Sequence, residues 1–263
     1  MFNIQNYMDN DDIKIVKEKG AFRVLEYQRD LSVTPGTAAT AYFSSMMNVR
    51  KRQVVCNLPE CGVTLQAGAM QWMVGNVQMT TGVQGVGDLV GKAFRGKASG
   101  ESAIKPEYRG NGLVALEPTY KHIILVDMND WGGGVVLEDG LFLACESSLQ
   151  HKTVMRSNFS SALGGGEGLF NLCLIGQGVA VLESDVPEEE LIAIDLNNDT
   201  LKIDGNMAIA WSPSLQFTVE RSGKSLIGSA ASGEGLVNVY RGSGRVLMAP
   251  VSEYTLSLLI SII

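Results

Sequence analysis

The chain has 263 residues, of which 45% are hydrophobic and 19% charged, a composition typical of a soluble globular protein with a sizeable core. Its 28 acidic and 21 basic residues give a formal net charge of −7, which argues against nucleic acid as a general partner because phosphate backbones are repelled. The 30 glycines predict many sharp turns.

The first 52 residues are predicted to be an N-terminal extension that contributes extra strands. Residues 21–33 alternate apolar and polar side chains like a strand, and TPGT at residues 34–37 is a turn signal. The basic stretch Asn48–Arg52 is interpreted as a charged, solvated strand edge. Because the chain does not open with a basic segment followed by an apolar run, no signal peptide is expected and a cytoplasmic location is predicted.

Two landmarks recur along the chain with nearly the same period. A Gly-Glu step stands before a G-x-G pair, and a strand-like apolar run follows each pair, which is therefore interpreted as a tight turn. The glutamates lie 66 and 67 residues apart, and the glycine pairs recur every 66 residues. The residues are Glu101, Glu167 and Glu234, then Gly110 with Gly112, Gly176 with Gly178, and Gly242 with Gly244. This periodicity predicts a repeated structural unit.

The fold class predicted from these patterns is all-β. Short runs of Val, Ile, Leu and Thr separated by Gly, Pro, Asn and Asp are typical of a β-sandwich or barrel. We expect three consecutive short β-sandwich repeats, similar to a double-stranded β-helix, at residues 53–120, 121–187 and 188–263. Each repeat alone buries only a modest core, so neighbouring repeats are expected to pack together.

Three stretches carry a resemblance to a known family. Residues 65–82 (LQAGAMQWMVGNVQMTTG), 164–184 (GGGEGLFNLCLIGQGVAVLES) and 232–250 (SGEGLVNVYRGSGRVLMAP) resemble the altered inheritance of mitochondria twenty-four-type proteins, which also occur in bacteria. The resemblance implies domains like those of the tryptophan RNA-binding attenuation protein, three per chain, and a trimer that closes into a ring of nine similar units. The family's biochemical activity is not established, so the resemblance leaves the function open.

The glycine-rich stretches do not predict a nucleotide site. A phosphate-binding loop needs a Lys followed by Ser or Thr and then a helix, whereas residues 164–170 offer a glutamate and a predicted strand. The repeated Glu101, Glu167 and Glu234 have two interpretations. They form a ring of carboxylates facing a central channel, or they accept backbone hydrogen bonds within their turns or lie in solvent.

The remaining polar residues do not form a recognisable catalytic set. His122 and His151 are the only histidines and fall in different predicted strands, which argues against the histidine-rich metal site of a cupin. Asp127 and Asp195 follow apolar strands, where Asx turns explain them. The four cysteines, which lack metal-binding or redox spacing, are predicted to be buried free thiols: Cys56, Cys61, Cys145 and Cys173.

The apolar C-terminus, residues 254–263, is too short to cross a bilayer as a helix, which takes about 20 residues, and is expected to be a final strand. No catalytic residue, metal ligand or cofactor is assigned. The favoured hypothesis is a non-enzymatic scaffold or binding ring, a homotrimer that contacts a protein or membrane-associated partner. The alternative is a ring that binds a small molecule or nucleic acid, by analogy with the attenuation protein. An enzyme whose site forms between subunits stays open.

Overall fold

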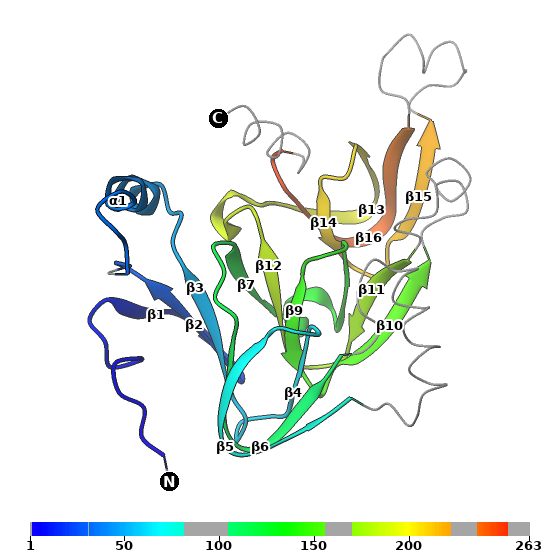
Figure 1. The fold of residues 1–263 in the computed structure, drawn as a ribbon. Helices are drawn as coiled ribbons and strands as arrows, with labels where there is room; N and C mark the ends of the chain where they lie inside the picture. The colour runs from blue at the N-terminus through cyan, green and yellow to red at the C-terminus, as the bar shows by residue number, and fades with distance from the viewer. Residues whose placement is uncertain (1, 31, 82–104, 156–169, 222–235, 252–263) are drawn as a thin grey trace.

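The computed structural model of the chain describes residues 2–30, 32–81, 105–155, 170–221 and 236–251 (Figure 1). These residues form an all-β fold with a single α-helix, which confirms the predicted fold class. The C-terminal strand expected at residues 254–263 lies outside the described residues.

The larger of two sheets has nine antiparallel strands and contains most of the N-terminal half of the chain. Its strands are, in spatial order, β1 (Ile13–Lys19), β2 (Phe22–Tyr27), β3 (Arg52–Asn57), β6 (Glu107–Leu116), β4 (Val63–Leu65), β9 (Phe142–Glu146), β12 (Val179–Ser184) and β7 (His122–Asp127), with β5 (Met70–Thr80) paired to β6. The helix α1 (Ala38–Met46) connects β2 to β3. The sequence predicted extra strands in this region but not the helix.

The smaller sheet has seven antiparallel strands and contains the C-terminal part of the chain. Its order is β10 (Gln150–Met155), β11 (Phe170–Ile175), β8 (Gly134–Leu137), β14 (Ala208–Trp211), β16 (Leu236–Met248) and β13 (Ile192–Asp204), with β15 (Gln216–Arg221) paired to β16. Two short 3₁₀ turns, η1 (Met128–Trp131) and η2 (Glu188–Glu190), follow β7 and precede β13.

Two of the three G-x-G pairs differ from the predicted tight turns. Gly110 and Gly112 lie inside the continuous strand β6, and Gly242 and Gly244 lie inside β16. Gly176 and Gly178, in contrast, separate β11 from β12. Gly110 has a φ of +131°, and a Cβ there would overlap the carbonyl oxygen of Asn76 on β5. The glycines therefore let one long strand change direction while its partner stays in hydrogen-bonding contact.

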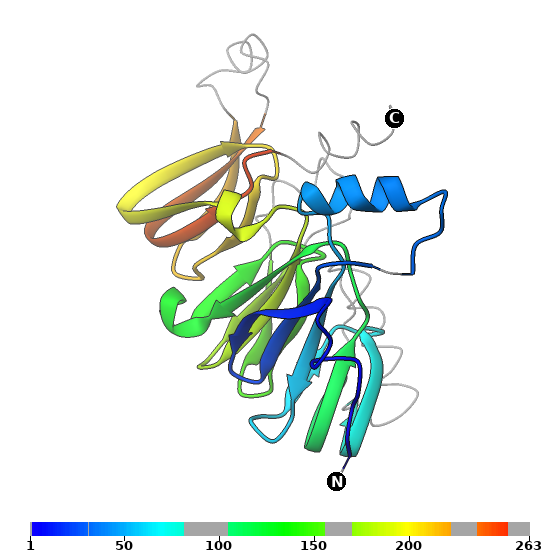
Figure 2. The same cartoon turned by 90° about the vertical axis from the view of Figure 1, so that its left-hand side faces the viewer.

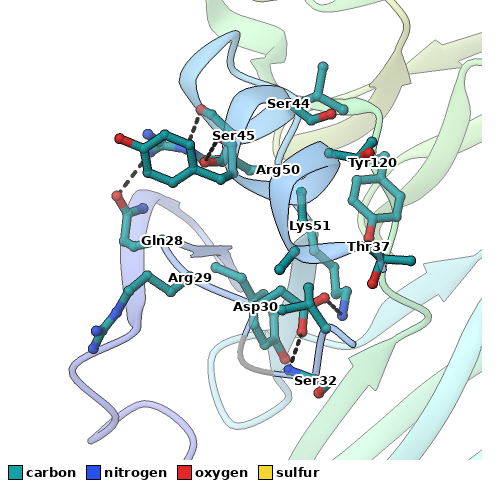
Figure 3. A pocket seen from close by; sticks show the side chains of 17 residues that line it. Gln28, Arg29, Asp30, Ser32, Thr37, Ser44, Ser45, Arg50, Lys51 and Tyr120 are labelled. Atoms are coloured by element: carbon teal, nitrogen blue, oxygen red, sulfur yellow. Dashed lines mark hydrogen bonds and ion pairs between the residues drawn. The ribbon is translucent and has the colours of Figure 1, made fainter. Parts of the chain in front are cut away.

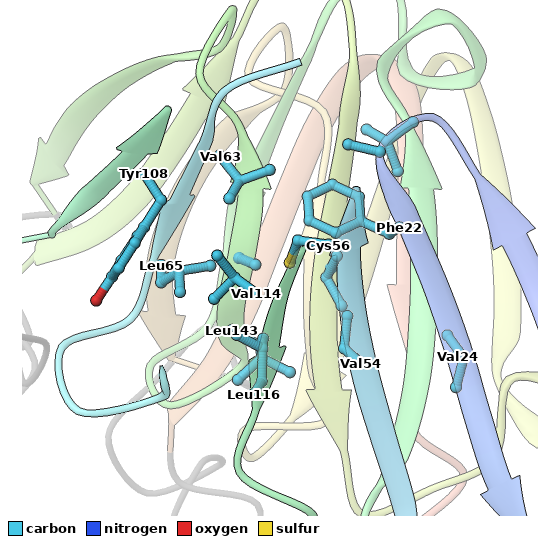
Figure 4. Close-up of a cluster of buried hydrophobic side chains, with 14 of the residues drawn as sticks. Phe22, Val24, Val54, Cys56, Val63, Leu65, Tyr108, Val114, Leu116 and Leu143 are labelled. Atoms are coloured by element: carbon cyan, nitrogen blue, oxygen red, sulfur yellow. The ribbon is translucent and has the colours of Figure 1, made fainter. Parts of the chain in front are cut away.

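Alternating apolar residues along the strands form a chain of adjoining cores. The first core gathers Phe22, Val54, Cys56, Val114 and Leu116, all fully or almost fully buried (Figure 4). It also includes Val181 of β12, so the N-terminal strands pack against a strand far along the chain. Two further clusters lie around β7, β8 and β12 and around β13, β14 and β16.

Two short strand pairs join successive parts of the chain. β4 pairs with β9, placing Leu65 opposite Ala144, and β8 pairs with β14, placing Leu137 opposite Ala210. All four residues are 0% exposed. The junctions are therefore continuous both in backbone hydrogen bonding and in the core.

The carboxylate of Glu146 links the N-terminal hairpin to the following strands. One oxygen accepts a hydrogen bond from the backbone N–H of Ala21 and the other from that of Val179, each at 3.0 Å. Gly20 and Gly178 lie against this carboxylate, where a Cβ would overlap it. One side chain thus satisfies two backbone donors from segments far apart in sequence.

Replacing Glu146 with Ala should leave both N–H groups without their acceptor and lower the free energy of unfolding by about 2–4 kcal/mol. Each hydrogen bond to a charged group contributes about 1.5–3 kcal/mol, and the sum of the two is reduced because Glu146 is only half-buried. Urea denaturation followed by tryptophan fluorescence measures this loss. The matched control is Glu60→Ala, because Glu60 is exposed. Equal stability of the two variants would contradict the proposed role of Glu146.

Candidate functional site

A cleft of about 740 Å³ lies under helix α1 (Figure 3). One wall comes from α1 and the turn before it, with Thr37, Ala38, Ala41, Ser44 and Ser45. The opposite wall comes from the end of β2, the start of β3 and the segment before β7, and includes Tyr27, Asp30, Lys51 and Tyr120. This volume lies within the range of about 300–1,000 Å³ typical of ligand sites.

Helix α1 forms because its sequence, AATAYFSSM, contains no Gly or Pro and begins after a turn. The expected turn at residues 34–37 is present, since the carbonyl of Thr34 accepts the N–H groups of Thr37 and Ala38 at 3.0 and 2.9 Å. The helix buries no side chain; Phe43 on it is 67% exposed, and Met47 directly after it is 78% exposed. Figure 2 shows the helix beside the ends of the strands instead of on the face of a sheet.

A charged network centred on Glu26 holds the C-terminal end of α1. Glu26 is 9% exposed and accepts hydrogen bonds at 3.0 Å from Arg50, Arg52 and Gln28. Arg50 also donates to the carbonyl of Ser45 at 3.2 Å, in the last turn of the helix. Ion pairs and backbone carbonyls thus replace the apolar packing that the helix lacks.

The interpretation of Asn48–Arg52 as a solvated strand edge is wrong for Arg52. This residue is 4% exposed, and its guanidinium donates both to Glu26 and to the side-chain oxygen of Asn48, the latter at 2.7 Å. A charge buried in this way requires a partner of opposite sign, and Glu26 supplies it. The sequence signal was the Glu26 of the preceding strand, which lies directly opposite Arg52 in the β2–β3 pairing.

The floor of the cleft contains a second ion pair. Lys51 Nζ lies 2.7 Å from Asp30 and 5.4 Å from the ring centroid of Tyr27. The hydrogen bond from Lys51 lowers the pKa of Asp30, and the same bond raises the pKa of Lys51. Burial raises the pKa of Tyr27. Near neutral pH the cleft therefore presents a charged pair beside a neutral phenol.

A second cluster joins a cysteine and a histidine that the sequence analysis treated separately. Cys145 Sγ on β9 lies 3.1 Å from Nε2 of His151 on β10, and Phe142 packs edge-on against the His151 ring at 5.8 Å. Burial raises the pKa of the Cys145 thiol, while burial and the charge of Lys105 lower the pKa of His151 to about 4 although part of this residue stays exposed. Both groups are neutral at physiological pH, unlike the thiolate–imidazolium pair of a nucleophilic site.

The other residues singled out in the sequence have the following positions. The repeated Glu101, Glu167 and Glu234 lie outside the described residues. Asp127 accepts a hydrogen bond from the N–H of Asn129 at 3.0 Å and caps η1, which confirms an Asx turn. For Asp195 the turn prediction is wrong, because β13 continues through it and its carboxylate pairs with Arg245 at 2.8 Å. His122 lies on β7.

The cysteines are free thiols in the structure. Cys56, Cys145 and Cys173 are buried, as predicted, and Cys61 is half-buried. Within residues that the structure describes, no group of three or more His, Cys, Asp or Glu side chains could hold a metal ion. In the same part of the chain, no helix has the length and apolar character needed to span a membrane.

Comparison with known proteins identifies the family. A family model described as mitochondrial biogenesis AIM24 matches residues 45–251. The chain belongs to the AIM24 family. A curated relative, an uncharacterized protein of Streptococcus pyogenes serotype M6, is 33% identical over 192 residues, which cover 70% of this chain and 75% of the relative.

A crystal structure of a Streptococcus pyogenes protein is also similar. It matches with a TM-score of 0.59 and 27% identity, covering 82% of this chain and 95% of that one. The family resemblance drawn from the sequence is thereby confirmed, and the likeness to the attenuation protein stays a prediction. Because the AIM24 match begins at residue 45, β1, β2 and most of α1 lie before it. The cleft is therefore built largely from residues outside the family match.

The pH dependence of the free energy of unfolding should reveal the contribution of the Glu26 network. Burial alone raises the pKa of Glu26, but hydrogen bonds from Arg50 and Gln28 and the charges of both arginines outweigh it, so its pKa lies below the usual 4.5. A lowered folded-state pKa gives stability that is present above the unfolded-state pKa and lost as pH falls through the folded one. Wild-type protein should therefore lose stability below about pH 4.5 more steeply than Glu26→Gln, as measured by urea denaturation between pH 3 and 6. Parallel curves would contradict this.

Thiol reactivity should distinguish an inert Cys145 from a nucleophile. Because the thiolate reacts and burial raises the pKa of this thiol, Cys145 should stay unlabelled by iodoacetamide in the native protein at pH 8. Mass spectrometry of digested protein measures the labelled fraction, with the half-buried Cys61 as the internal comparison. Faster labelling of Cys145 than of Cys61, abolished by His151→Ala, would reveal an activated thiol instead.

Proposed function

We propose that the protein is a non-enzymatic assembly protein whose three β-units close into a homotrimeric ring with surfaces for a protein or membrane-associated partner. The units are residues 53–120, 121–187 and 188–263, with residues 1–52 as an extension. The ring of similar units is what the attenuation-protein likeness implies for this family. The observation that supports it best is the register of the strand pairs that join one unit to the next.

The strand pairings support three equivalent units. In the third unit, β16 pairs with β13 along one edge and with β14 and β15 along the other. In the second, β11 and β12 together take the place of β16, pairing with β7 and β8 on one edge and with β9 and β10 on the other. In the first, β6 pairs with β3 and β4 on one edge and β5 on the other.

The two junctions between successive units pair equivalent residues, so their registers are the same. Strand β4 meets β9 with Leu65 opposite Ala144 and Thr64 opposite Cys145. Strand β8 meets β14 with Leu137 opposite Ala210 and Val136 opposite Trp211. Measured from the glycine pairs, Leu65 and Leu137 are equivalent positions, as are Ala144 and Ala210.

If the third unit were joined to a further unit in the same register as the two junctions above, two strand edges without a partner would meet. The position equivalent to Leu65 and Leu137 is Ile203 on β13, whose outer edge has no partner strand among the described residues. The position equivalent to Ala144 and Ala210 is Trp72 on β5, which pairs only with β6 there. Pairing between copies would place Ile203 opposite Trp72 of the next copy, and Lys202 opposite Met73 of the next copy.

Closure into a ring removes both open edges. A head-to-tail contact between different surfaces yields either a closed ring or an open filament, and unpaired strand edges promote aggregation. The number of three copies comes from the family likeness.

Engineered disulfides test the ring. Residues directly opposite in an antiparallel pair have Cα atoms about 4.5–5.5 Å apart, within the range a disulfide spans. The double variant Lys202→Cys with Met73→Cys, made in a Cys61→Ser background, should therefore oxidise to covalent species of two and three chains on a non-reducing gel.

The control for this cross-link moves one cysteine along the strand. Asp199→Cys with Met73→Cys places the thiol three residues from the predicted partner, about 10 Å away, so cross-linking should be lost. Equal cross-linking of the two pairs would contradict the register. Light scattering that shows a stable monomer at micromolar concentration would contradict the ring itself.

The alternative is a ring that binds a small molecule or nucleic acid. The cleft under α1 favours the small-molecule form. Against nucleic acid, several cations of the described surface are engaged by carboxylates, including Arg109 with Glu107 and Arg245 with Asp195. A filter-binding assay with an RNA pool at low salt should show no retention.

A further inference from the structure

We propose that the cleft under α1 binds an apolar carboxylate, an amphiphile with one anionic headgroup and an aliphatic or aromatic body. The proposal concerns residues that largely precede the family match and is independent of ring assembly. Three properties of the cleft support it: the sign of its charge, the chemistry of its walls and the lack of packing beneath the helix.

The cleft carries the opposite charge to the chain as a whole. Its lining includes the cations Arg29, Arg50 and Lys51 and one carboxylate, Asp30. Adding the partners just behind the lining, which are Asp12, Glu26 and Arg52, gives four cations against three carboxylates and leaves one positive charge in excess. The full chain has a net charge of −7. An anion therefore finds in this cleft a local surplus of positive charge.

Arg50 is the residue best placed to hold the headgroup. Its side chain is 29% exposed, and its Nη1 donates to Glu26 at 3.0 Å. The same nitrogen donates to Gln28 at 2.9 Å (Figure 3). A guanidinium fixed in this way has lost its rotamer freedom before the ligand arrives, so binding a carboxylate costs less entropy. Hydrogen bonds from arginine to a carboxylate are also among the stronger ones in proteins.

The walls suit an apolar body. Tyr27 and Tyr120 contribute aromatic surface, and Val33 and Val49 contribute aliphatic surface. Tyr120 is 59% exposed, and both valines are exposed as well. Apolar side chains that line a concave site without being buried gain free energy when a ligand removes them from water, at about 25 cal/mol per Å².

The helix wall of the cleft leaves room for a ligand. Apart from Tyr42, the helix residues that line the cleft are small, and none of the nine helix residues is buried; the small ones are Ala38, Thr40, Ala41, Ser44 and Ser45. Isolated helices shorter than about 12–15 residues are marginal in water, so α1 depends on its surroundings. An apolar ligand between these small side chains and the tyrosines would supply the packing that the protein itself does not.

Isothermal titration calorimetry with octanoate tests the proposal on the full-length protein. Octanoate should bind with one site per chain. Octanamide, which has the same body without the charge, should bind at least tenfold more weakly, and acetate, which has the headgroup alone, should give no measurable heat. Equal binding of octanoate and octanamide would contradict the role of the cationic surplus.

Two variants locate the site. Arg50→Gln should weaken octanoate binding at least tenfold, but Arg50 also holds the end of α1, so this variant alone could act through the helix. Ala41→Trp keeps the helix wall and fills the cleft, and it should also weaken binding at least tenfold. The matched control is Ala39→Trp, because Ala39 is exposed on the same helix and does not line the cleft, and its affinity should stay within twofold of wild type.

Three results would overturn the proposal. The first is no octanoate binding by the wild-type protein, and the second is equal loss of binding in Ala41→Trp and Ala39→Trp. The third is cosedimentation with phosphatidylglycerol vesicles without binding of free octanoate, which would show that the surface binds membranes instead. A protein that binds octanoate as proposed yet remains monomeric would refute the ring and leave this site intact, so the two proposals fail separately.

Discussion

The close approach of two backbones at Gly110 and Gly112 is the constraint on which the arrangement of the larger sheet depends. At Gly112 a Cβ would overlap the carbonyl oxygen of Val74, and at Gly110 it would overlap that of Asn76. Because neither position tolerates a side chain, β6 can bend while remaining bonded to β5 along its whole length. The bend lets a single strand contact different partners at its two ends. As a result, β3 and β4 pair with successive parts of the same edge of β6.

Sequence patterns predicted the fold class and the family because both depend on features that are local in the chain. Runs of β-branched residues between glycines indicate strands wherever they occur, and residues 164–184 are distinctive enough to indicate the family. The helix α1 was missed because it has no apolar face directed to a core, which is the periodic signal by which amphipathic helices are recognised. Its stability comes from Arg50 and Glu26, which are 24 residues apart in the chain.

The candidate site was beyond sequence reasoning for the same reason. The cations of Asn48–Arg52 suggest a solvated edge when considered alone, and only the β2–β3 register shows that Glu26 lies opposite Arg52. Likewise, Cys145 and His151 come together from consecutive strands that belong to different sheets, without a recognisable motif. The repeated glutamates drew attention by their spacing, but the cleft is formed by residues that do not recur. The spacing of the glutamates therefore gave no guide to the cleft, most of whose lining precedes residue 53.

The carboxylate of Glu146 ties the first 52 residues to the rest of the β-structure. It is bonded to Ala21 in the N-terminal hairpin and to Val179 on β12, while Phe22 of the same hairpin is 0% exposed in the first core. A chain shortened to begin at residue 53 would uncover that core and leave one oxygen of the carboxylate without its donor. The extension is thus not an appendage to a preformed β-structure. It completes the first core, and cooperative unfolding of the protein should include it.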